Sequence, residues 1–346
     1  MHAYGNDTFF ETIHLLEHLV LNNGYRFSYQ RKFGSFNGRT TGSFLSFFVE
    51  HHHHFAMRAT HELLKLLQLP LSINQHDIDA ELQLLEAEEL NQNPRTKIIQ
   101  GIEKYFHGVQ ASPDLNVKYM EELHSRVLNQ NPSIVFLQGD MEKESIQQAI
   151  KSIELYLASK ETVVPLEYDA ISDYKPEREF FEGGKVKKIG LYLGFPIDKI
   201  LDKPRLVVFN RFLMEFIYEN LFEYVRFVEQ VDYEPIWVHR LVPYAWQISW
   251  EFFSQIDSEN LYYLIENMFF KTEEDFERMK EKIYYSILLW KDDMTLTGYF
   301  INQEYLISKE VKSIEQIAEE VRSITYDEFV GYYNNMLPSI SMRKLS

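Results

Sequence analysis

The sequence has no cysteine among its 346 residues. This absence excludes disulfide bonds, thiolate metal ligands and cysteine nucleophiles together. Any transition metal that the chain binds must therefore be held by imidazole and carboxylate groups. A chain without disulfides also fits a reducing compartment.

Long apolar runs are missing as well. No stretch of the sequence approaches the ~20 apolar residues that a membrane-spanning helix needs. Residues 1–6 lack the basic start and the apolar stretch of a signal peptide. We therefore expect a cytoplasmic protein with no membrane insertion.

Positive charge is scarce. The chain has 35 basic and 52 acidic residues, which gives a formal net charge of −17. Such a surface repels nucleic acid and attracts cationic ligands such as basic peptides, so we expect no nucleic-acid partner. A competing interpretation is that the acidity only keeps the chain soluble.

The sequence does contain a mixture of helix and strand patterns. Helical periodicity covers residues 9–22, and strand patterns cover 27–35 and 40–50. After a charged stretch with two prolines, a second half repeats this combination. We predict an α+β fold with two related domains, each an antiparallel-rich sheet packed with several helices. The predicted bounds are 1–160 for the N-terminal domain, 161–180 for the linker and 181–346 for the C-terminal domain.

The first predicted helix carries an inverted His-x-x-Glu-His motif at His14, Glu17 and His18. On a 3.6-residue period these side chains share one face, while the intervening leucines turn toward the core. Two imidazoles one turn apart can bind one zinc ion, and the glutamate can take a proton from zinc-bound water. A competing interpretation is a surface helix with incidental histidines.

A catalytic zinc needs a third protein ligand, and the acidic helical pattern over residues 79–89 is the best place for it. Glu81 and Glu88 are seven residues apart, so they lie on one helical face. The competing interpretation of this segment is a solvated acidic helix.

The inverted motif, followed later by this Glu-x₆-Glu pair, resembles the insulinase/pitrilysin-type inverzincins. These zinc metallopeptidases include the mitochondrial processing peptidases and bacterial processing proteases. The resemblance implies one Zn²⁺ per chain, held by His14, His18 and Glu88. It also implies that Glu17 is the general base and that Glu81 is a supporting acid near the site.

Between the two motifs, Asn37, Gly38, Arg39 and Thr40 stand where the family has an Asn-Ala-x-Thr edge strand that binds the substrate peptide. An unpaired strand edge offers backbone N–H and C=O groups to an extended peptide largely regardless of its sequence. The resemblance therefore implies that peptides add to the strand near residues 37–44.

In the second half, residues 220–226 resemble the family's Leu-Phe-x-x-x-Arg helix end, and Tyr233 follows Arg226 at the family's spacing. In catalytic members this pair reaches into the zinc site, which implies that Arg226 and Tyr233 stabilise the developing oxyanion. The competing interpretations are a cation that compensates the helix dipole and an ordinary strand aromatic. The sequence between the two residues departs from the family pattern.

These features predict a zinc metalloendopeptidase that hydrolyses small or unfolded peptides, with a leader or signalling peptide as one candidate substrate. The alternative is a non-catalytic structural or regulatory subunit of a heterodimeric peptidase of the same family.

In that family the zinc site faces the C-terminal domain of a second unit, so the resemblance implies a homodimer or a heterodimer with a homologous subunit. Only thirteen residues precede His14, and residues 337–346 stand where the family has a final strand. We therefore expect trimmed sheets, or sheets that a partner chain completes.

Residues 51–54 are four consecutive histidines. Histidine tracts bind metal, but successive residues of a strand alternate between its two faces, which would prevent a shared site. The expectation is therefore against a functional metal site at this tract.

Overall fold

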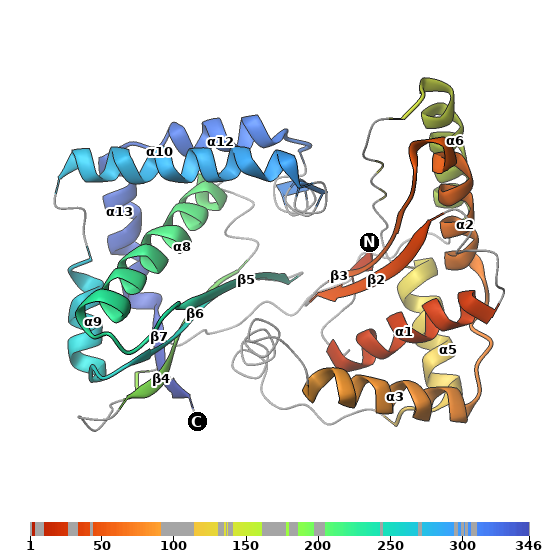
Figure 1. Cartoon of the computed structure of the whole chain (residues 1–346), viewed down its shortest axis with the longest axis horizontal. Coiled ribbons are helices and arrows are strands. Elements are labelled where there is room, and N and C mark those ends of the chain that lie inside the picture. Colours follow the sequence, from red (N-terminus) through yellow and green to blue (C-terminus); the bar gives the residue numbers. More distant parts are fainter. Residues whose placement is uncertain are drawn as a thin grey trace. The chain divides into compact units, whose positions relative to one another are not determined.

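The computed structural model describes residues 2–3, 10–26, 34–41, 44–90, 114–130, 135, 137, 141–160, 178–179, 186–196, 205–242, 245–268, 272–293, 297–298, 301, 304–305 and 310–345. The described residues up to Lys160 belong to one compact unit, and those from Arg178 onward belong to another. Each unit combines antiparallel strands with helices (Figure 1), which confirms the α+β class. The predicted domain bounds and the relationship between the halves stay predictions.

The sheet of the first unit has three strands in the order β1-β3-β2, all antiparallel. Their bounds are His2–Ala3 for β1, Ser35–Thr41 for β2 and Phe44–Glu50 for β3. Strand β2 begins where the sequence pattern placed the end of a strand, and residues 27–33 of that prediction lie outside the described residues. Along β2 the exposed side chains alternate with less exposed ones, as a half-buried strand requires.

Five helices complete the described part of the first unit. They are α1 (Phe10–Arg26), α2 (Ala56–Gln68), α3 (Gln75–Leu90), α5 (Val117–Ser125) and α6 (Lys143–Ala158). Helix α1 contacts β2, α2, α3 and α5, which makes it the centre of this unit. Its inward side chains Ile13, Leu16 and Leu19 are fully buried in the core.

The sheet of the second unit has four strands in the order β5-β6-β4-β7, again all antiparallel. The bounds are Lys187–Pro196 for β4, Ile236–Val242 for β5, Ala245–Ser254 for β6 and Ser341–Leu345 for β7. The expectation that the final strand is missing was wrong, because β7 pairs with β4 along five residues. The segment is short and mixed in polarity, so its strand pattern is weak in the sequence.

The described helices of the second unit are α8 (Arg205–Glu223), α9 (Ser258–Glu266), α10 (Glu273–Leu289), α12 (Ile314–Arg322) and α13 (Tyr326–Met336). Helix α13 begins at a capping box in which Thr325 and Glu328 bind each other's backbone N–H groups. The core between α8, α10 and α13 is aromatic: Phe212 stacks on Phe276 and meets Phe329 at a tilt of 47°. None of the described helices is long and apolar enough to span a bilayer.

Candidate metal centre

Helix α1 divides its side chains between the core and a polar face. Leu15 and Leu16 are fully buried, whereas His14 and His18 are partly exposed on the other side. The two imidazole rings lie one turn apart, with centroids separated by 4.9 Å. The 3.6-residue period therefore places both histidines on one face of α1, where one ion could reach them.

Glu88 of α3 lies against this pair. Its Oε2 atom is 3.8 Å from Nε2 of His14 and 3.8 Å from Nε2 of His18. Ligands around a tetrahedral zinc at about 2.1 Å are about 3.4 Å apart, so only a small closure brings all three atoms to bonding distance. Two imidazole nitrogens and one carboxylate oxygen form a donor set that zinc prefers, and they leave one position open.

Glu81 lies on the same face of α3 as Glu88. It is behind the histidines and is buried. Its Oε2 atom is 3.0 Å from Nδ1 of His18, and Asn22 donates a hydrogen bond to its Oε1 atom. A proton on Nδ1 of His18 satisfies the carboxylate and leaves the Nε2 lone pair directed to the side of Glu88. Glu81 thus orients the imidazole of His18, and its supporting role at a metal stays a prediction.

Sequence reasoning missed Asn22. It lies one turn after His18 and two turns after His14, so the helical period places all three on one stripe of α1. This spacing was the available signal, but asparagine is too common on helix surfaces for the spacing alone to reveal a contact with Glu81.

His14 is held in its neutral form. Burial, followed by the proximity of His18, lowers its pKa to about 4. At neutral pH the ring is therefore uncharged and does not repel a cation.

Glu17 lies on the same helix and is buried against strand β2. Thr40 donates a hydrogen bond of 2.5 Å to its Oε2 atom, and a Cβ at position 38 would lie 2.5 Å from its Cγ atom. Burial raises the pKa of Glu17, and the Thr40 hydrogen bond opposes part of this rise. The carboxylate is consequently a better proton acceptor than an exposed one.

The four predicted substrate-binding residues lie on two faces of β2. Gly38 and Thr40 face Glu17, whereas Asn37 and Arg39 are on the exposed face. Among the described strands β2 pairs only with β3, so its outer edge carries no described ladder. The contact between Thr40 and Glu17, the predicted base, was not predicted from the sequence.

Arg226 and Tyr233 belong to the second unit. Arg226 lies in a π-helical turn, Tyr224–Val228, that continues α8. Its guanidinium carbon is 4.2 Å from the centroid of the Tyr233 ring, and its Nη1 atom donates to the Tyr233 carbonyl at 3.4 Å. The Tyr233 side chain is 77% exposed. The two residues therefore act as a pair, and their role at the metal centre stays a prediction.

Comparisons with known proteins bear on the fold. No family model matches the sequence, and no curated protein matches it. Solved structures match over nearly the whole chain. A protease from Helicobacter pylori has 13% identity and a TM-score of 0.72, with 99% of this chain and 91% of that chain covered.

Two further structures are similar to this chain. A putative M16-like peptidase from Alicyclobacillus acidocaldarius has 13% identity and a TM-score of 0.62, over 95% of this chain and 84% of that one. The periplasmic protease PqqL from Escherichia coli has 11% identity and a TM-score of 0.62, and this chain spans 44% of its length. At such identities the likeness establishes the fold, and the chain has the pitrilysin-like fold of the M16-like proteases.

Proposed function

We propose that the chain is a zinc-dependent endopeptidase that hydrolyses peptide bonds in small or unfolded peptides. The observation that carries this proposal is the convergence of His14, His18 and Glu88 from two helices on one point, beside the buried carboxylate of Glu17. The solved structures with the same fold are described as proteases or peptidases, which supports the same class of reaction.

In this proposal His14, His18 and Glu88 hold one zinc ion. Zinc in such a site supplies Lewis-acid polarisation of a carbonyl and lowers the pKa of water. The buried Glu81 keeps His18 in the required orientation, and Asn22 fixes Glu81 in turn. Groups behind the ligands of this kind commonly contribute ~10- to 100-fold in metal affinity or activity.

Glu17 acts as the general base and accepts a proton from the attacking water. Its position is fixed by the hydrogen bond from the Thr40 hydroxyl and by close packing against β2 at Gly38. After the attack, the same carboxyl group is placed to return the proton to the leaving amine.

The substrate peptide adds to the outer edge of β2 near residues 37–44, where backbone groups recognise an extended chain. Arg226 and Tyr233 supply a cation and a phenol that stabilise the developing oxyanion. The acidic net charge of −17 favours basic peptides, and a leader or signalling peptide fits these requirements.

The test compares wild-type protein with Glu17→Gln in zinc analysis and in cleavage of fluorogenic basic peptides. The substitution keeps the size of the side chain and removes the base, so cleavage should fall by about 100- to 10,000-fold while zinc content is retained. Glu86→Gln is the matched control, because Glu86 is exposed on α3 and belongs to no described contact of the centre. Its activity should equal that of wild type.

Unchanged cleavage in Glu17→Gln would exclude Glu17 as the base. If the wild-type chain holds no zinc and cuts no peptide, alone or with added zinc, the chain is instead a non-catalytic subunit of a heterodimeric peptidase.

A further inference from the structure

A second group of possible metal ligands lies in the histidine tract. If these residues continued a strand, their side chains would point to alternating faces. In the structure β3 ends at Glu50, and the chain bends into a 3-10 turn, His53–Phe55, before α2 begins. The Phe55 N–H closes this turn by donating to the His52 carbonyl at 2.8 Å.

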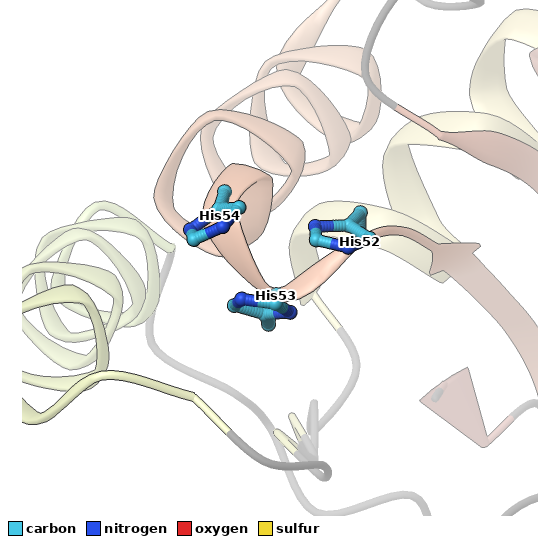
Figure 2. A group of neighbouring side chains, drawn as sticks. All are labelled: His52, His53 and His54. Carbon is cyan, nitrogen blue, oxygen red and sulfur yellow. The ribbon is translucent and has the colours of Figure 1, made fainter.

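The turn brings three imidazole rings together (Figure 2). The ring centroids are 4.1 Å apart for His52 and His53, 3.9 Å for His53 and His54, and 5.0 Å for His52 and His54. His51 does not join them, since its Nδ1 atom lies 3.1 Å from the His52 carbonyl oxygen. One nitrogen from each of the three rings lies within 4.8 Å of the other two.

We propose that His52, His53 and His54 form a second metal site, which binds a divalent transition ion such as Zn²⁺ on the surface of the first unit. The imidazole nitrogen is a preferred ligand for these ions. A tetrahedral ion with ~2.1 Å bonds places its ligands about 3.4 Å apart, and the three side chains are exposed, so they can rotate to reach that spacing.

The neighbouring helix offers a fourth group. Glu142, the residue just before α6, places its Oε1 atom 3.8 Å from Nδ1 of His54. The carboxylate can complete the ligand set or neutralise part of the charge of the ion. An ion at this point would connect the turn at the start of α2 with the start of α6, two helices that pack on each other.

An ion bound at these histidines would stabilise the folded chain and would not form a second catalytic centre. Because the folded chain positions the three rings and the unfolded chain does not, ion binding stabilises the folded state by mass action. This site shares no residue with the His14 centre, so the proposal does not rest on the proposed peptidase function.

The experiment separates the two sites with double variants of the full chain. His14→Gln/His18→Gln removes ligands of the centre on α1, and His53→Asn/His54→Asn removes two of the three exposed imidazoles. Co²⁺, a spectroscopic substitute for Zn²⁺, is titrated into each protein in competition with a chelator. We expect two equivalents for wild type, one for each double variant and none for the combined variant.

A synthetic peptide of residues 49–56 is the control for adventitious binding by a histidine run. The folded His14→Gln/His18→Gln protein should bind Co²⁺ at least about 10-fold more tightly than this peptide, because folding fixes the rings in advance. Glu142→Gln in the same background should weaken binding several-fold, and Zn²⁺ should raise the unfolding temperature only while His53 and His54 are present.

Three outcomes would overturn the proposal. The first is a stoichiometry that His53→Asn/His54→Asn leaves unchanged, and the second is a single equivalent in wild type that His14→Gln/His18→Gln removes. The third is an affinity equal to that of the peptide, which would mean adventitious imidazole binding only. Circular dichroism checks that each variant is folded, so loss of binding cannot be assigned to unfolding.

Discussion

Glu17 occupies space that is open only because residue 38 is glycine and has no side chain. A Cβ there would lie 2.5 Å from Cγ and 2.7 Å from Oε1 of Glu17, well inside van der Waals contact. The family pattern that the motif resembles has alanine at this position, so glycine is a departure in this chain. The backbone of β2 thus determines where the proposed base can lie.

We predict that Gly38→Ala lowers kcat by about 10- to 100-fold while zinc content and the folded state are retained, because the added methyl displaces Glu17 from Thr40. The measurements are peptide-cleavage kinetics and metal analysis. Gly331→Ala is the control, since a Cβ at Gly331 meets nothing within 4 Å. A Gly38→Ala enzyme with wild-type kcat would show that the carboxylate works from another position.

His124 of α5 gives the first unit a pH-dependent stability. Burial lowers its pKa to about 4, against 6.5 in the unfolded chain, so the folded state disfavours the proton. Its contribution is complete above pH ~6.5 and is lost as the pH falls toward 4, by up to about 3 kcal/mol. Urea unfolding between pH 4 and pH 8 should therefore show a smaller loss of stability for His124→Gln than for wild type.

The quantity compared for His124 is the slope of the unfolding free energy against pH. A constant destabilisation by the substitution does not affect this slope. His76→Gln, at an exposed position of α3, should keep the wild-type slope. Parallel slopes for wild type and His124→Gln would mean that this histidine takes up its proton in the folded chain.

Helix α1 has two functions on opposite faces. One face supplies buried core residues such as Ile13 and Leu16, and the other carries the histidines and Glu17. Because the core fixes the rotation of the helix, it also fixes the side of α1 from which the histidines project.

Helix α13 contains a glycine in its interior at Gly331, where the position offers open space. We predict that Gly331→Ala stabilises the protein by about 0.5–1 kcal/mol, because alanine restricts the unfolded chain and favours the helix. The measurement is the free energy of unfolding in urea at pH 7. A destabilised variant would indicate that another chain packs on this face of α13.

Features that depend on residues close together in the sequence could be predicted from local patterns. The motif on α1 and the capping box at Thr325 depend on spacings of three and four residues, which the helical period fixes. Glu88 required the family resemblance, because an acidic helix alone does not show which carboxylate meets a distant histidine.

Contacts between residues far apart in the sequence could not be predicted from the sequence alone. The contact between Thr40 and Glu17 depends on how β2 packs across α1, and the contact of Asn22 with Glu81 depends on how α3 lies beside it. The turn at His52–Phe55 was missed for a related reason, since a histidine run has no strong preference between strand and turn.

For the chain as a whole, we predict an active dimer, either of two copies or with a homologous subunit. The resemblance to the inverzincins implies this assembly, because in that family the zinc site of one unit faces the C-terminal domain of a second, where Arg226 and Tyr233 would lie. Light scattering after size exclusion should give the active species a mass about twice that of the 41.3 kDa chain, or that of the chain and its partner together. A fully active monomer would contradict this prediction.

The side chain of Glu88 is 54% exposed, whereas those of His14 and His18 are 23% and 17% exposed. Among the three proposed zinc ligands, Glu88 is therefore the one that solvent reaches most easily. A metal held there would leave and return through the Glu88 side, and it would equilibrate with free zinc in the surroundings. Turnover would then follow zinc supply, and the same polypeptide would work as an enzyme or stand idle according to the ion content of its compartment.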